Sequence, residues 1–306
     1  MSLAHLADCV EPQSTTLQLI GQKHRPSKFG YSHSHGSAPG KRVYTHTSFD
    51  RIYPEYLEPY RRKKFRLLEI GLDSGASLTT WLEYFPCAEI YGVDLLQERT
   101  QTFGSRRVTT HAGDAGNVTF LADVVRKSGG LFEVIVDDGG HHIADQLASY
   151  TFLFEHGLAH GGMYIVEDIE TSYYLPGIPL YHTRLRGASG CDTNQKGGKL
   201  STVDAFTRMV DAPINGKFSD DQRVVVGGVD HWVRSVTFAQ NLILLRKKNE
   251  EDCFAQGPYV WQHKLDTSCP ARKQPATPVM EGNPFWAWCV AARGFSSVAK
   301  WPVNHG

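Results

Sequence analysis

The sequence has no excess of either charge, since its 306 residues include 32 Lys and Arg against 32 Asp and Glu. A chain without net charge has no global field that would gather nucleic acid or anionic lipid. No apolar run approaches the roughly 20 residues that span a bilayer, and the first residues lack the basic flank and apolar run of a secretory signal. We therefore expect a cytoplasmic protein that acts on a small molecule, with no nucleic-acid partner and no membrane partner.

Cysteine is scarce and scattered along the chain. The six cysteines are Cys9, Cys87, Cys191, Cys253, Cys269 and Cys289. No two of them form a CxxC pair, and they do not cluster as zinc ligands do. This spacing predicts reduced thiols with a mainly structural role.

Composition and patterning divide the chain into three parts. Residues 1–60 are rich in His, Ser, Gly and Pro and form a lead-in segment that ends in a short helix, with a possible part in oligomerisation. Residues 61–248 are expected to form one large α/β domain. Within it, the polar and glycine-bearing stretch at about 172–200 is too long for an ordinary connection and is typical of an active-site lid. Residues 249–306 are a C-terminal extension with no assigned role.

Strands and helices alternate through the middle of the chain. Expected strands lie at 66–71, 89–95, 107–113, 132–136 and 163–166, and expected helices at 77–85, 118–128, 143–158 and 200–210. Two closing strands are expected at 224–226 and 233–245. This alternation predicts right-handed crossovers and an α/β fold with a doubly wound, mostly parallel sheet, closed by an antiparallel strand. In such sheets ligands bind beyond the carboxyl ends of the strands.

A strand, a glycine turn and a helix follow one another in LLEIGLDSGAS, residues 67–77, which is the layout of a nucleotide-binding first βα unit. A dinucleotide turn would have glycine where Asp73 stands, and a carboxylate there would repel a pyrophosphate. S-adenosylmethionine carries a positive sulfonium and no phosphate, so it tolerates acids near the turn. We therefore predict that Glu69, Gly71, Gly75 and Ser77 bind this cofactor.

Acids also close the later strands. Asp94 follows the glycine turn by about 20 residues, where an acid commonly accepts hydrogen bonds from ribose hydroxyls. Asp114 closes the third strand and is assigned to the adenine amino group, and Asp137 at the end of the fourth is assigned to the same cofactor. The alternative is that Asp94 and Asp114 are helix N-caps, a common use of Asp after a strand.

Two acidic motifs, VDDGGHH at 136–142 and VEDIETSYY at 166–174, follow strands that one helix separates. Such strands are expected to be neighbours, and grouping their acids would cost several kcal/mol unless a cation compensates the charge. Oxygen ligands with open positions suit Mg²⁺. The predicted ligands are Asp138, Glu167 and Asp168, with turn and capping roles as the alternative.

Methylation of an aliphatic hydroxyl needs a base that takes its proton as the new bond forms. His141 lies three residues past Asp138 on a turn that contains two glycines. We predict that it is this catalytic base, close to the cation but not bound to it.

In order and spacing, LLEIGLDSGAS, IYGVD, AGDAGN, IVDDGGHH and VEDIETSY resemble the metal-dependent macrolide-sugar O-methyltransferases, the group that includes the mycinamicin and rhamnosyl enzymes. The similarity covers about residues 44–174 and extends to the lysine-and-tyrosine lead-in from Lys28, but it does not cover the C-terminal tail. It implies a Rossmann-like methyltransferase fold, S-adenosylmethionine and Mg²⁺ as cofactors, and transfer of a methyl group to a hydroxyl of a small molecule such as the sugar of a glycosylated natural product. It assigns Mg²⁺ to Asp138, Glu167 and Asp168 and the base to His141, and it suggests a homo-oligomer.

Three alternatives remain open from the sequence. One is a metal-independent methyltransferase of the same fold. Another is a non-heme iron hydroxylase, in which Asp138, His141 and His142 would imitate a triad of two histidines and one carboxylate. The last is a non-catalytic protein that binds S-adenosylmethionine.

Overall fold

The computed structural model describes residues 16–31, 38, 41, 47–100, 103–173, 179–180, 183–184, 202–209 and 229–252. The predicted strand at 224–226, most of the predicted lid and the C-terminal extension beyond residue 252 lie outside these ranges. Within the described residues, no helix is long and apolar enough to cross a membrane.

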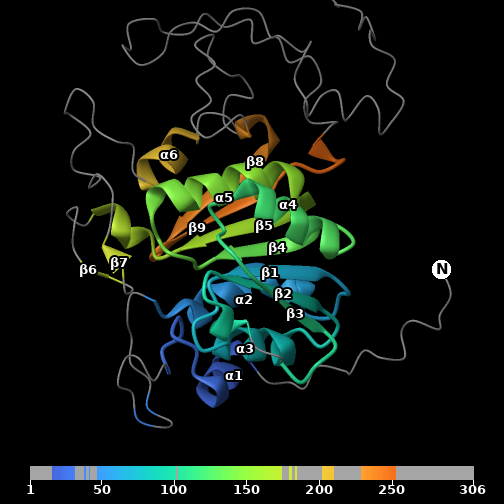
Figure 1. The fold of residues 1–306 in the computed structure, drawn as a ribbon, viewed down its shortest axis with the longest axis vertical. Coiled ribbons are helices and arrows are strands. Elements are labelled where there is room, and N and C mark those ends of the chain that lie inside the picture. The colour runs from blue at the N-terminus through green and yellow to red at the C-terminus, as the bar shows by residue number, and fades with distance from the viewer. Residues whose placement is uncertain are drawn as a thin grey trace, which may run out of the picture.

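A seven-stranded sheet forms the centre of the protein (Figure 1). Its strands are β1 (Arg66–Ile70), β2 (Glu89–Asp94), β3 (Val108–Ala112), β4 (Phe132–Asp137), β5 (Leu158–Glu167), β8 (Val233–Ala239) and β9 (Leu242–Lys247). They are arranged in the order β3-β2-β1-β4-β5-β9-β8. The first five are parallel, and β9 and β8 are antiparallel. The doubly wound, mostly parallel sheet expected from the sequence is confirmed.

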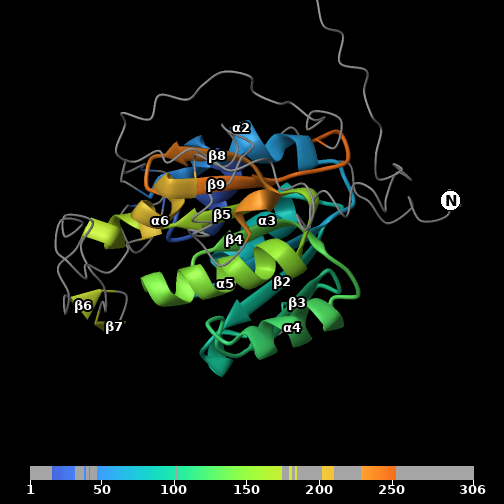
Figure 2. The same cartoon turned by 90° about the horizontal axis from the view of Figure 1, so that it is seen from above.

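Helices cover both faces of this sheet. The described α-helices are α1 (Leu17–His24), α2 (Tyr53–Leu57), α3 (Ala76–Tyr84), α4 (Val118–Lys127), α5 (Ile143–His156) and α6 (Thr202–Met209). Short 3-10 turns are η2 (Phe49–Arg51), η3 (Glu58–Tyr60), η4 (Gln97–Arg99), η5 (Ile169–Tyr173) and η6 (Asp230–Trp232), and β6 (Pro179–Leu180) pairs with β7 (Thr183–Arg184). Helices α4, α5 and α6 lie on one face and α1, α2 and α3 on the other (Figures 1 and 2).

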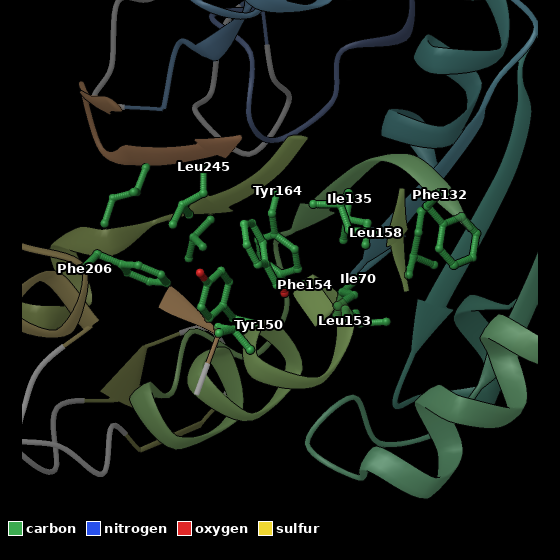
Figure 3. Close-up of a cluster of buried hydrophobic side chains, with 14 of the residues drawn as sticks. Ile70, Phe132, Ile135, Tyr150, Leu153, Phe154, Leu158, Tyr164, Phe206 and Leu245 are labelled. Carbon is green, nitrogen blue, oxygen red and sulfur yellow. The ribbon is translucent and has the colours of Figure 1, made fainter. Parts of the chain in front are cut away.

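The core on the α5 face is built from large side chains of β4, α5 and β5 (Figure 3). The Tyr150 ring meets the Tyr164 ring edge-on at 5.3 Å between centroids and the Phe206 ring at 4.9 Å. Phe206 comes from α6, so this helix is part of the core and not a surface addition. Such contacts fix α5 against the strands whose ends carry the acidic motifs.

The core on the opposite face includes side chains from the described part of the lead-in segment. Leu17, Ile20 and Phe29 are fully buried there together with Tyr53 and Trp81. The Phe29 and Trp81 rings lie 6.0 Å apart, and those of Tyr53 and Trp81 lie 5.5 Å apart. The described part of the lead-in is therefore packed onto this face of the sheet, and it reaches the edge formed by the carboxyl ends of the parallel strands.

Two strand predictions need correction. Strand β5 begins at Leu158, five positions before the predicted start at 163, and it contains Gly161 with a φ of +76° at an irregularity in its pairing with β4. Glycines inside a strand weaken its sequence pattern. The predicted single strand at 233–245 is wrong, because the chain turns back at Asn241 to form the β8–β9 hairpin.

The expectation of reduced thiols is wrong for Cys87, the cysteine that lies within the described residues. Cys87, which follows α3, is disulfide-bonded.

Candidate functional site

The predicted acids lie at the carboxyl edge of the parallel strands, and alternation along each strand decides which face each one meets. Glu69 stands two positions after Leu67, and Glu167 stands two positions after Ile165. Both carboxyl groups therefore point to the same face as these buried residues, the face on which Lys28 lies. Asp137 stands two positions after Ile135 and points to the α5 face. The strands thus separate the acids into two groups.

The turn after β1 is packed against the turn after β4. Gly71 has a φ of +85°, and a Cβ atom added there would lie 1.9 Å from the carbonyl oxygen of Asp138. Its N–H donates to the Val93 carbonyl, and the Asp138 N–H donates to the Ile70 carbonyl. Only glycine allows this approach. Gly75, with a φ of +78°, is the N-cap of α3, and Ser77 lies buried in the first turn of that helix.

A buried lysine joins three of the acids. The Lys28 ammonium lies 2.6 Å from Glu69 Oε1, 3.0 Å from Glu167 Oε1 and 3.0 Å from Asp138 Oδ2. Burial lowers the pKa of Lys28, but attraction to the three carboxylates outweighs it and raises this pKa well above its usual range. The Tyr53 hydroxyl also donates to Glu167 Oε1. Lys28 is therefore a charged residue at the centre of the acidic cluster.

Burial raises the pKa of both Glu69 and Glu167, and Lys28 opposes this shift. The second oxygen of each carboxyl group, Oε2, is buried and has no hydrogen-bond partner among the described residues. A buried carboxylate oxygen without a partner is costly. The single ammonium thus leaves part of the negative charge at this edge uncompensated.

Next to this cluster, Asp138, His141 and Asp168 each offer one atom, and these atoms all lie within 4.8 Å of one another. His141 Nε2 is 3.9 Å from Asp138 Oδ1 and 3.7 Å from Asp168 Oδ2. Two carboxylates with a neighbouring acid that has an unpartnered oxygen, Glu167, suit a hard divalent cation. The residues present fit the predicted cation.

The structure brings the three predicted ligands to one edge but groups them differently from the sequence prediction. His141 stands with Asp138 and Asp168, whereas Glu167 is engaged by Lys28 and Tyr53. The group holds one histidine, so it does not reproduce the two-histidine triad of an iron hydroxylase. His142 is the N-cap of α5 and lies outside it.

The backbone is strained at two of these residues. His141 has a φ of +54° and Asp168 a φ of +53°, conformations that non-glycine residues rarely adopt. The Asn241 side chain, at the β8–β9 turn, donates to Asp168 Oδ1 at 3.0 Å and accepts from the Glu170 N–H at 2.9 Å. Strain of this kind persists where surrounding contacts enforce it, and it is common at functional sites.

His141 is buried, with 4% of its surface exposed. Burial lowers its pKa, against the attraction of Asp138 and Glu170. A neutral imidazole can accept a proton, as the predicted base must.

Asp137 lies apart from the cation group. Its Oδ2 accepts from the Ser149 hydroxyl at 2.5 Å and the Tyr164 hydroxyl at 2.8 Å, and its side chain is buried. Burial raises the pKa of Asp137 to about 6, although these hydrogen bonds lower it. Because the carboxyl group is used inside the core, the prediction that it binds the cofactor gains no support here.

The remaining cofactor-binding predictions lie along the β1–β3 edge. Asp94 accepts from the backbone N–H groups of Leu72 and Leu96, at 2.8 and 2.9 Å, and ties the end of β2 to the glycine turn. Asp114 is exposed and accepts from the Gly116 N–H at 2.8 Å. Both residues lie at the strand ends where the sequence predicted ribose and adenine binding. In the structure, each carboxyl group accepts hydrogen bonds from backbone N–H groups of a turn.

Sequence reasoning missed several residues of this edge. Lys28 and Tyr53 come from the lead-in, and Asn241 from a turn hidden inside a predicted strand. Asp145, in α5, was also missed: its Oδ1 and that of Asp114 both lie next to Gly116, 3.1 and 3.2 Å from the position that a Cβ atom would take there. The helical pattern at the end of the lead-in could locate Tyr53 in a helix, but nothing in the local sequence indicates that Lys28 or Tyr53 contacts a carboxylate of the sheet.

No protein-family model matches the chain. Among curated proteins, the mycinamicin VI 2''-O-methyltransferase of Micromonospora griseorubida is 31% identical over 256 residues, which are 81% of this chain and 56% of that enzyme. The L-olivosyl-oleandolide 3-O-methyltransferase of Streptomyces antibioticus is 39% identical over 133 residues, which are 41% of this chain and 33% of that enzyme. The resemblance to macrolide-sugar O-methyltransferases is confirmed.

The chain spans about half the length, or less, of these sugar O-methyltransferases. A solved structure of the methyltransferase MycE from the mycinamycin biosynthetic pathway, in complex with Mg and SAH, is 24% identical and superposes with a TM-score of 0.61. It matches 78% of this chain and 56% of that one. The similarity confirms the class I methyltransferase fold.

Proposed function

We propose that the protein is an S-adenosylmethionine-dependent O-methyltransferase that uses a divalent cation, Mg²⁺, to methylate a hydroxyl on the sugar of a small natural product. The observation that carries the proposal is the meeting of Asp138, His141 and Asp168 beside buried Glu167, at the strand ends next to the glycine turn. The sequence similarity to sugar O-methyltransferases supports the same reaction.

In the proposed reaction, the oxygen of the acceptor hydroxyl forms a bond to the methyl carbon of the sulfonium. The carbon–sulfur bond breaks, and sulfur keeps its electron pair. The hydroxyl proton passes to His141, so the products are a methyl ether and S-adenosylhomocysteine. Asp138, Glu167 and Asp168 would hold the divalent cation, which would compensate the charge of these acids and lower the pKa of the acceptor hydroxyl.

The chain's own residues have three tasks in this scheme. Gly71 lets the backbone after β1 approach the turn after β4, where the cofactor is expected. Asn241 orients Asp168 through its side-chain hydrogen bond. Burial keeps His141 neutral and away from bulk water, so that it is ready to take a proton.

The first prediction concerns His141. We expect His141→Ala to lower kcat by about 10²- to 10⁴-fold, the usual contribution of a positioned base, and to leave S-adenosylmethionine binding intact. Turnover is measured as the gain of one methyl group by a glycoside acceptor, and cofactor binding by calorimetry. Unchanged turnover in this variant would remove the proposed mechanism.

EDTA separates the proposal from a metal-independent methyltransferase, which would keep its rate when the chelator is added. Restoration of activity by Mg²⁺ is expected. A non-catalytic protein would bind S-adenosylmethionine and methylate none of the glycosides, and oxygen uptake that depends on Fe(II) would indicate a hydroxylase.

A further inference from the structure

Lys28 lies at the point where the lead-in segment meets the acidic edge. Its side chain is 3% exposed, and its ammonium is within 3.0 Å of oxygens from Glu69, Asp138 and Glu167. These acids come from the ends of β1, β4 and β5. One positive charge from a distant part of the chain therefore holds together the ends of three strands.

Two of these three acids are also proposed cation ligands. Lys28 contacts Asp138 through Oδ2, while Oδ1 of the same group faces His141. It contacts Glu167 through Oε1, and Oε2 has no hydrogen-bond partner among the described residues. A divalent cation bound by Asp138 and Glu167 would repel a neighbouring ammonium, because both charges would be buried in the same low-dielectric region.

Glu69 can remain the ion-pair partner of Lys28 when the cation is bound. It is buried, it forms the shortest of the three contacts at 2.6 Å, and it is not among the proposed cation ligands. Lys28 can therefore give up Asp138 and Glu167 without becoming an unpaired buried charge.

We propose that Lys28 is a positioning residue that competes with the divalent cation: its ammonium holds Asp138 and Glu167 in place before the cation binds and withdraws towards Glu69 when the cation enters. The inference rests on the proposed function, since it takes these two acids as cation ligands. It implies that cation binding is coupled to the position of residues 25–31, which follow α1 and carry Lys28.

The test is Mn²⁺ binding to the purified full chain, followed by the loss of the free Mn²⁺ resonance signal. Removal of the competing charge in Lys28→Met should tighten Mn²⁺ binding by at least about tenfold relative to the wild type. Lys28→Arg keeps the charge and should remain within about threefold of the wild type. Lys23→Met is the matched control, because Lys23 is exposed and pairs with Glu83, away from the site.

A second measurement uses the wild type, in case Lys28→Met does not fold without the cation. Hydrogen exchange of residues 25–31 should become faster when Mn²⁺ is added, because the segment loses two of its three ionic contacts. Equal Mn²⁺ affinity in wild type and Lys28→Met, or exchange unaffected by Mn²⁺, would overturn the role of Lys28 and leave the cation site standing. Failure of both proteins to bind Mn²⁺ would overturn the cation site itself.

Discussion

Among individual residues, Asp137 should make the free energy of unfolding depend on pH, because its carboxyl group is buried in the core. Its pKa is about 6 in the folded protein against an ordinary value of 3.8, so the folded state binds the proton more tightly than the unfolded state. The resulting stabilisation is complete below about pH 3.8 and is lost as the pH rises through about 6. Asp137→Asn should remove this part of the pH dependence, on the order of 3 kcal/mol.

Free energies of unfolding in urea, measured from pH 4 to pH 7, test this prediction. The difference between variant and wild type isolates Asp137 from the other buried acids. Glu55→Gln, at an exposed position, is the control and should keep the wild-type profile. A pH profile shared by wild type and Asp137→Asn would contradict the prediction.

At this same scale, the sequence located the acids of the site but missed the buried ammonium of Lys28, which contacts Glu69, Asp138 and Glu167. Asp138, Glu167 and Asp168 could be found because strands of a doubly wound sheet end at one edge. Lys28 could not, because 139 positions separate it from Glu167 and no local pattern encodes their contact. Alternation along β4 decides which face of the sheet the Asp137 side chain points to, but it can be used only when the end of β4 is known.

Among the elements, the β8–β9 hairpin connects the sheet edge to the site. Its turn residue Asn241 has a φ of +57° and holds Asp168 by a hydrogen bond. Loss of a residue that orients a metal ligand typically weakens metal binding by about 10- to 100-fold. We expect Asn241→Gly, which allows the same turn without strain, to weaken Mn²⁺ binding by this factor.

Mn²⁺ titration of the purified variant provides the measurement. Gln240→Ala, at the neighbouring exposed position, should bind Mn²⁺ as the wild type does. If Asn241→Gly also bound Mn²⁺ normally, the hairpin would have no part in orienting Asp168.

The positions of elements were predictable where hydrophobic periodicity is unbroken. Strands β1, β2, β3 and β4 and helices α3, α4 and α5 begin within a residue or so of their predicted starts. The prediction failed at β5, where glycines interrupt the pattern, and at the hairpin. In the hairpin, the turn at Asn241 lies inside the stretch 233–245 that was predicted as one strand, and a single Asn is a weak turn signal.

On the scale of the whole molecule, the described part of the lead-in segment belongs to the fold. Ile20 is 2% exposed and packs in the same core as Trp81, whereas its neighbour Leu19 is 54% exposed. Ile20→Ala should lower the free energy of unfolding by about 2–5 kcal/mol, the usual cost of such a truncation in a core. Leu19→Ala is the matched control and should change it by less than about 0.5 kcal/mol.

Urea unfolding of the two variants gives the comparison. Similar small effects from both substitutions would mean that α1 contributes little to stability, and the packing described for the lead-in would then be wrong.

The ion pair between Lys28 and Glu167 has a consequence for synthesis on the ribosome. Lys28 emerges early, yet its carboxylate partner follows 139 positions later, and contacts of such long range form slowly. During translation Lys28 must therefore wait for this partner until strand β5 has been made. The acidic edge is therefore complete only once the last parallel strand, β5, has been synthesised.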